Sequence, residues 1–152
     1  MNKVSVVGPE GGEVIDLGPA RIRILEDGGT AVHRLGVAEI TLAPRGEGPP
    51  QHRPAGHDEG FCVISGAAVI TVGGAVHEAP AGTSVMVPPG APHTFANPGD
   101  EPLVMLNTFT PDRSVQYFRD LRDVIAGGGE ADARTVAEVM GRYETTPADD
   151  FA

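Results

Sequence analysis

Short runs in which apolar and polar residues alternate, separated by glycine- and proline-rich turns, occupy the chain from residue 4 to about residue 109. The run Arg21-Ile22-Arg23-Ile24-Leu25 alternates strictly, which predicts a strand with one buried face and one face in water. Further strands are expected at 37–42, 61–64, 67–72, 75–77, 83–87, 94–95 and 103–109. Eight or more short strands at this spacing predict a sandwich or a closed barrel.

Two of the turns carry a clear signal. Ser65-Gly66 separates two of the expected strands, and Gly73-Gly74 lies between Val72 and Ala75. A two-glycine loop between strands predicts a tight hairpin turn of the primed type, which needs a positive φ.

After Pro111 the pattern changes to a helical period. Apolar residues from Val115 to Ile125 recur at that spacing, with Ser114 as the predicted N-cap and glycines 127–129 as the stop. A second amphipathic helix is expected within 132–143.

The change of period divides the chain in two. We expect a β-barrel domain at 1–110 and a helical extension at 111–152, packed on the barrel or on a dimer partner. Residues 145–152 are expected to be a frayed end.

Composition and charge remove several classes of function. Glycine (21) and proline (14) are abundant without a G-X-Y period, which excludes collagen and disfavours a helical bundle. A net charge of −10 disfavours binding to nucleic acid or to anionic membranes. The single cysteine, Cys62, allows neither an internal disulfide nor a cysteine-rich zinc site. No apolar run approaches the roughly 18 residues of a membrane span and the start lacks a signal-peptide core, so we expect a soluble, cytoplasmic protein.

Candidate chemistry is concentrated in two segments, 46–66 and 82–97. The first contains His52, His57 and Glu59, and the second contains His93. His57 and Glu59 are two residues apart, so in an extended chain they point to the same face. Imidazole and carboxylate are ligands of Zn, Fe, Mn, Ni and Cu. His33 and His77 lie away from this group and are interpreted as ordinary surface residues.

These two segments resemble the two signature motifs of the cupin superfamily. The first motif is usually written G(X)5HXH(X)3-4E(X)6G, and the second G(X)5PXG(X)2H(X)3N. The residues that match are Gly46, His52, Glu59 and Gly66 in the first motif, and Gly82, Pro88, Gly90, His93 and Asn97 in the second. Pro54 stands where the first motif has its second histidine. The compact spacing of the motifs and the two-helix tail resemble small single-domain cupins of the quercetin-dioxygenase-like type.

The resemblance implies an all-β fold, a double-stranded β-helix or jelly-roll barrel, followed by two short C-terminal helices. It also implies one divalent transition metal ion (Fe, Ni, Mn, Cu or Zn) held by His52, Glu59 and His93. Because proline has no ligating atom, three outcomes are open at Pro54. The site works with three ligands, or His57 replaces the missing one, or metal binding is lost and Glu59 acts with His57 or His52 as acid and base.

Strand alternation also predicts which side chains face a bound molecule. Phe61 and Val63 share the face of Glu59, and Phe95 and Asn97 share that of His93. Met86, Met105 and Asn107 are further candidates of uncertain phase, and Gln51 is a candidate donor to a substrate oxygen. The expected substrate-binding set is therefore Gln51, Phe61, Val63, Phe95, Asn97 and Met86. Such a lining is mostly apolar and suits a small aromatic or polyketide-like molecule.

Three hypotheses for function follow. The first is a metal-dependent enzyme, most concretely a dioxygenase acting on a phenolic, enolic or polyketide-like substrate. The second is a metal-independent cyclase, isomerase or dehydratase, and the third is a non-enzymatic module that binds a small molecule. The resemblance also implies a homodimer, for which the sequence offers only the amphipathic tail helices as support.

Overall fold

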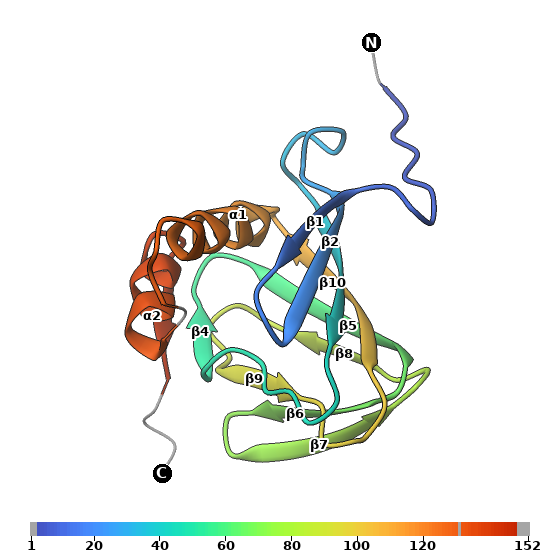
Figure 1. Ribbon diagram of the computed structural model, residues 1–152, viewed down its shortest axis with the longest axis vertical. Coiled ribbons are helices and arrows are strands. Elements are labelled where there is room, and N and C mark those ends of the chain that lie inside the picture. Colours follow the sequence, from blue (N-terminus) through green and yellow to red (C-terminus); the bar gives the residue numbers. More distant parts are fainter. Residues whose placement is uncertain (1–2, 131, 149–152) are drawn as a thin grey trace.

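The computed structural model describes residues 3–130 and 132–148, and its centre is a barrel of two antiparallel sheets (Figure 1). The first sheet has the order β1-β2-β3-β10-β5-β8. Its strands are β1 (Glu13–Asp16), β2 (Ala20–Glu26), β3 (Gly36–Leu42), β5 (Asp58–Ser65), β8 (Ser84–Val87) and β10 (Leu103–Thr110). The second sheet has the order β11-β4-β9-β6-β7. Its strands are β4 (His52–Pro54), β6 (Ala67–Val72), β7 (Ala75–Pro80), β9 (His93–Ala96) and β11 (Thr145–Pro147).

Consecutive strands alternate between the two sheets from β4 to β10, apart from the β6–β7 hairpin, and the architecture is the expected double-stranded β-helix. The chain crosses from β5 to β6 at Gly66, which has a φ of +77° and packs against the loop before β10. A Cβ there would lie 2.6 Å from the carbonyl oxygen of Pro102, so glycine is required at this crossing. The φ of +60° at Gly73 confirms the primed hairpin turn.

The period of two in the sequence becomes the inner and outer faces of the barrel. Alternate residues of β3 and β10 are buried, among them Ile40, Met105 and Phe109. Phe61 and Phe95 come from opposite sheets and their ring centroids lie 5.6 Å apart. The core is therefore the space between the sheets, and side chains that point inward from either sheet can meet there.

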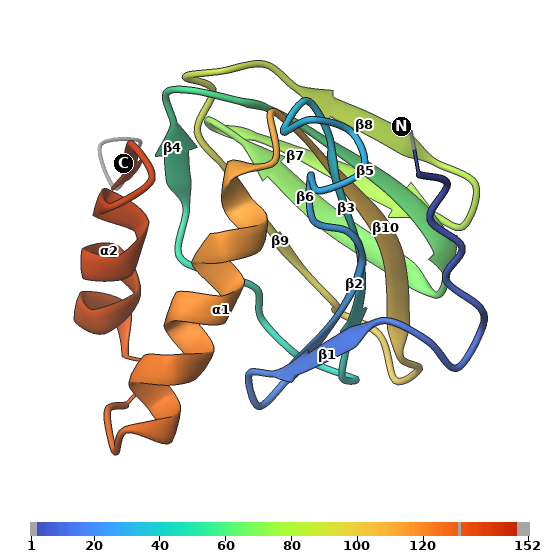
Figure 2. The same ribbon diagram turned by 90° about the horizontal axis from the view of Figure 1, so that it is seen from above.

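Two helices cover one end of the barrel, beside β4 (Figures 1 and 2). They are α1 (Arg113–Ala126) and α2 (Ala133–Gly141), within the two stretches where the helical period predicts them. The N-cap of α1 is Asp112, not Ser114, which lies in the first turn with its side chain buried. The prediction of a capping role for Ser114 was therefore wrong, because its hydroxyl is turned toward the barrel.

The C-terminal extension also contributes a strand. Thr145–Pro147 form β11, which pairs with β4 at the edge of the second sheet, and residues 149–152 lie outside the described residues. The expectation of a frayed end was therefore wrong for 145–147. No helix in the described parts of the chain is both long and apolar enough to cross a membrane.

Ion pairs of two arginines connect α1 to the first sheet. Arg119 forms ion pairs with Glu13 of β1 at 2.8 Å and with Asp27 at 3.1 Å, and Arg122 pairs with Glu13 at 2.7 Å. These side chains are partly exposed, so each pair contributes little alone, yet together they fix the position of the helix over the barrel.

Candidate functional site

Three buried side chains from both sheets meet inside the barrel. They are His52 of β4, Glu59 of β5 and His93 of β9, and one ligand atom of each lies within 4.8 Å of the others. β4 and β9 pair at His52 and His93, whose ring centroids are 4.5 Å apart. The two signature segments are thus brought together by strand pairing across the second sheet.

The imidazoles are held in a defined tautomer by the backbone. The Nδ1 atom of His52 donates to the carbonyl oxygen of Pro50 at 2.9 Å, and that of His93 donates to the carbonyl oxygen of Ala91 at 3.1 Å. Because a carbonyl oxygen only accepts, each Nδ1 carries a proton and Nε2 is left for the site. This is the arrangement by which metal-ligating histidines are oriented in proteins.

Charges in the cluster are set by burial and by the neighbours. Burial alone would raise the pKa of Glu59, but the neighbouring imidazoles of His57 and His93 outweigh it and hold that pKa well below its usual value. Burial opposes the charge on His93, but the bond from its Nε2 to Glu59 Oε2, at 2.8 Å, raises its pKa. Burial lowers the pKa of His52. Glu59 is therefore an anion, paired with His93, beside a neutral His52.

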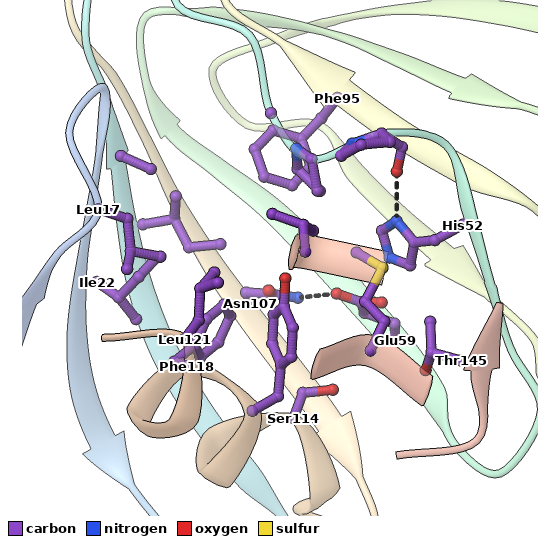
Figure 3. Close-up of a pocket in the computed structure, with 18 of the residues that line it drawn as sticks. Leu17, Ile22, His52, Glu59, Phe95, Asn107, Ser114, Phe118, Leu121 and Thr145 are labelled. Carbon is purple, nitrogen blue, oxygen red and sulfur yellow. Dashed lines mark hydrogen bonds between the residues drawn. The ribbon is translucent and has the colours of Figure 1, made fainter. Parts of the chain in front are cut away.

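Asn107 of β10 holds the second carboxylate oxygen. Its side-chain nitrogen donates to Glu59 Oε1 at 3.3 Å (Figure 3) and to the carbonyl oxygen of Gly60 at 2.9 Å. Asn107 is 1% exposed, so this contact is protected from water. The carboxylate is thus fixed by groups from two different strands.

The donor set fits a divalent transition metal ion. Two histidines with Nε2 directed at the site and one carboxylate are ligands that such ions accept, and a site of this type leaves coordination positions open. A metal ion bound to His93 Nε2 would take the place of the proton that this atom shares with Glu59. Metal binding and that proton therefore exclude each other.

Pro54 lies two residues after His52 on β4 and is also buried, so the two share a face. An imidazole at Pro54 would point to the same side as His52. Pro54, the position at which the sequence departs from the motif, therefore lies at the site itself.

His57 lies next to the cluster but is bound elsewhere. Its Nε2 is 3.1 Å from the Ser114 hydroxyl of α1 and 3.9 Å from Glu59 Oε2. Its Nδ1 is buried and has no hydrogen-bond partner among the described residues. His57 is not part of the group whose ligand atoms lie within 4.8 Å of one another. In this arrangement it links the barrel to α1.

A cavity of about 260 Å³ adjoins the cluster. Figure 3 shows His52, Glu59 and Thr145 on one side of it, and Leu17 and Ile22 on the opposite side. Neither Lys nor Arg is found among the described residues that line it. The cavity therefore has a polar end at the cluster and a largely apolar wall that also includes Glu47, and its described lining carries no positive charge outside the histidines.

The helices complete this cavity. Their lining residues are Ser114, Tyr117, Phe118 and Leu121 of α1 and Val136 and Met140 of α2. The sequence did not indicate that these residues belong to the site, because a helical period shows that a face is buried and does not show which element it packs against. The spacing from Ser114 to Leu121, with a serine and a tyrosine on an otherwise apolar stripe, was the available signal.

Of the six residues expected to bind substrate, Phe95 lines the cavity, and the other five are absent from its described lining. Phe61 and Val63 are core residues, and Phe61 packs edge-on against the His93 ring at 5.8 Å. Met86 is 66% exposed, because Val85 and Val87 take the inward positions of β8. Asn107 lines the cavity, whereas Met105 is buried in the core.

Asn97 and Gln51, the other two residues expected to bind substrate, hold backbone segments in place. Asn97 donates to the carbonyl oxygens of Leu42, Ala43 and Glu101 and accepts from the Gly99 amide. Gln51 donates to the carbonyl oxygen of Ala148, whose amide in turn donates to the Gln51 carbonyl. Neither amide side chain is directed to the cavity.

Comparison with known proteins places the fold. Residues 38–109 match the family model described as the cupin domain. An RmlC-like cupin from Shewanella frigidimarina has a TM-score of 0.63 and 24% identity, over 76% of this chain and 99% of that chain. KdgF from Halomonas sp. has a TM-score of 0.65 and 17% identity, over 75% and 99%. The polyketide cyclase RemF from Streptomyces resistomycificus has a TM-score of 0.62 and 18% identity, over 71% and 80%. No curated protein matches the chain.

Proposed function

We propose that this chain, whose residues 38–109 match the cupin-domain model and whose fold is similar to that of solved cupins, is an enzyme that holds one divalent transition metal ion at His52, Glu59 and His93. Its substrate is a small, largely apolar molecule with a phenol or enol oxygen. The observation that carries this proposal is the meeting of three buried, oriented donor groups at the polar end of an apolar cavity.

Each residue of the cluster has a defined task in this proposal. His52 and His93 present Nε2, Glu59 presents one carboxylate oxygen, and Asn107 keeps the other oxygen in place. When bound, an ion in a site of two histidines and one carboxylate supplies Lewis acidity and, if redox-active, a route to dioxygen chemistry. Glu59 is also the carboxylate that a bound phenol or enol would meet, because it lies at the cavity wall.

The cavity wall supports a substrate without strong charge. Phosphate and carboxylate groups are usually held by Arg or Lys, and the described lining has neither. A volume of about 260 Å³ is at the small end for ligand sites and accommodates one or two rings. These features favour a phenol or a short polyketide-like enol over a sugar phosphate. A dioxygenase-like reaction on such a molecule is our most concrete form of the proposal.

A second candidate is supported by the Glu59–His93 contact and by Pro54. The 2.8 Å pair forms between protein groups alone, and proline removes one of the motif's ligands. In this alternative, His57 and Glu59 act as acid and base in a cyclase, isomerase or dehydratase without metal. The name of RemF, a polyketide cyclase, suits an enolic substrate of this kind.

Elemental analysis separates the two candidates. The protein is purified without chelator beside His93→Ala and the control His77→Ala, which alters an exposed histidine of β7. About one equivalent of a transition metal in the parent and the control, and almost none in His93→Ala, supports the first candidate. A parent without metal, and without uptake on addition of iron(II), manganese(II), nickel(II), copper(II) or zinc(II), contradicts it.

Pro54→His sharpens that result, since it would restore the fourth ligand of the motif. Tighter metal binding in this variant than in the parent is expected if three ligands already form the site. Uptake only in Pro54→His would show that the parent has lost its metal and would favour the acid–base candidate.

The homodimer stays a prediction. Light scattering coupled to size-exclusion chromatography tests it, with a mass near twice 15.7 kDa as the expected result.

A further inference from the structure

Two tyrosines on the helical cover line the cavity, and their hydroxyls are used differently. Tyr117 of α1 and Tyr143, which follows α2, have ring centroids 6.3 Å apart in an edge-on contact. The hydroxyl of Tyr143 donates to the carboxylate of Asp120. The hydroxyl of Tyr117 has no hydrogen bond within the described residues 3–130 and 132–148.

The packing contacts of the Tyr117 ring do not explain why this residue carries a hydroxyl. It packs against both apolar clusters of the protein, the barrel core and the α1–α2 contact, and it touches Phe118 at 5.3 Å between centroids. A phenylalanine would satisfy these contacts equally. Tyr117 is partly buried and borders the cavity, and tyrosine hydroxyls beside an apolar site usually find a hydrogen-bond partner. The hydroxyl of Tyr117 is therefore unexplained by the protein alone.

The surroundings of Tyr117 point to a partner inside the cavity. Tyr117 stands on the same helical face as Ser114, Phe118 and Leu121, which Figure 3 shows turned to the cavity. Burial, and in addition the negative charge of Glu59, raise the pKa of Tyr117, so the phenol stays neutral. No hydrogen bond joins it to Glu59 among the contacts of the described residues. Both Tyr117 and Glu59 line the cavity.

We propose that the Tyr117 hydroxyl is a substrate-binding group that donates a hydrogen bond to an uncharged carbonyl oxygen, so that the substrate is a hydroxyaryl ketone or an enolised diketone. Its phenol or enol oxygen lies at the His52–Glu59 end, and its carbonyl oxygen lies under α1. This assignment rests on the proposed function for the position of the first oxygen. It adds the second oxygen and the residue that selects it.

The chemistry of the lining agrees with this substrate class. A neutral phenol is a good donor to a ketone oxygen, while a carboxylate or phosphate would need a cation, which the described lining does not provide. The rest of the substrate would contact apolar side chains of both the barrel and the cover, among them Ile22, Phe95 and Leu121. Tyr117 is thus a specificity-determining residue, separate from the metal-ligand cluster.

Two probes that differ in one carbonyl test the proposal. Ortho-hydroxyacetophenone has the phenol and the ketone, and ortho-ethylphenol has the same size without the ketone oxygen. Their dissociation constants are measured by titration calorimetry with the full-length parent, with Tyr117→Phe and with the control Tyr143→Phe. Tyr143→Phe removes a hydroxyl that Asp120 already binds, and melting curves of all three proteins confirm that they are folded.

The expected result is a preference of the parent for the ketone by about fivefold, the equivalent of one neutral hydrogen bond. This preference should disappear in Tyr117→Phe and persist in Tyr143→Phe, while the affinity for ortho-ethylphenol stays the same in all three.

A ketone preference that survives in Tyr117→Phe overturns the proposal, and so does a parent that binds neither probe or binds both equally. The metal content of the same samples reports on the proposed function independently. A protein with one equivalent of metal and no ketone preference would retain the proposed metal site and lose only the role of Tyr117.

Discussion

The barrel end of the cavity and its helical cover hold their polar groups in different ways. In the barrel, Glu59 is held between His93 and Asn107, and the Nδ1 atoms of His52 and His93 are each held by a backbone carbonyl oxygen. On the cover, Ser114 makes one contact, to His57, and the Tyr117 hydroxyl makes none within the described residues. Groups with fixed partners suit a permanent task such as holding a metal, whereas a hydroxyl without one suits a ligand that comes and goes.

The largest predicted effect is on the free energy of unfolding, and it should differ between the barrel core and the helical cover. Phe61→Ala should reduce the free energy of unfolding by about 4 kcal/mol, because Phe61 is 2% exposed and packed on all sides in the barrel. Phe118→Ala should cost about 2 kcal/mol, because this ring borders the existing cavity and loses fewer contacts. Urea denaturation followed by circular dichroism measures both. If Phe61→Ala does not fold, Phe61→Leu gives the same ranking, and an equal cost in both regions would contradict the comparison.

The next effect concerns the support of the carboxylate. Asn107→Ala removes the donor to Glu59 Oε1 and should weaken metal binding by about tenfold to a hundredfold. Competition with a chromogenic chelator measures it. Thr108→Ala, which alters the neighbouring residue on the opposite face of β10, is the control and should leave the affinity unchanged. Equal affinities in parent and Asn107→Ala would show that this contact does not hold the ligand.

A smaller effect is expected where the two regions meet. Ser114→Ala leaves His57 Nε2 without its hydroxyl partner and should cost about 1–2 kcal/mol of stability. A double-mutant cycle with His57→Ala should give a coupling of about 1 kcal/mol between the residues. Additive effects would mean that the barrel and α1 are not linked through this pair.

The smallest effect concerns the ion pairs beneath α1. Bonds from Arg119 and Arg122 lower the pKa of Glu13, and the Gly29 amide and Arg119 lower that of Asp27. A lowered folded-state pKa means stability that is present above the ordinary values of 4.5 and 3.8 and is lost as the pH falls through the lower folded values. Arg119→Gln should therefore cost about 0.5–1 kcal/mol at neutral pH, and less in acid.

Urea denaturation at several pH values checks this prediction. The control is Arg134→Gln, which removes an exposed pair within α2 and should have almost no effect at any pH. A cost for Arg119→Gln that does not fall with pH would mean that its ion pairs are not responsible.

Most of the barrel could be predicted because its strands carry their own signal. A period of two over six to eight residues, as in β3, β6 and β10, shows both the strand and its buried face. β4 and β11 have three residues each, too few for a period, and each exists because a distant segment pairs with it. Ladder pairing of this kind cannot be found in the local sequence.

In the site, too, some features could be predicted from the sequence and others depended on segments far apart in the chain. Spacing in the two motifs identified His52, Glu59 and His93 correctly as neighbours, since the motif encodes strand positions of a known barrel. It did not identify the lining, because strand phase at Met86 and the partners of Gln51 and Asn97 depend on the surrounding structure. Ser114 was interpreted as a helix N-cap, and Tyr117 was not singled out.

By itself, then, the sequence determined the β-rich class, most strands and both helices, because these follow from periodicity along the chain, and its resemblance to the two cupin motifs indicated the three-residue cluster. Only the tertiary structure decided that α1 and α2 close the barrel, that His57 binds Ser114, and that the Tyr117 hydroxyl has no hydrogen-bond partner among the residues the structure describes. Those features arise where segments far apart in the chain meet, and their energies depend on contacts that no local pattern contains.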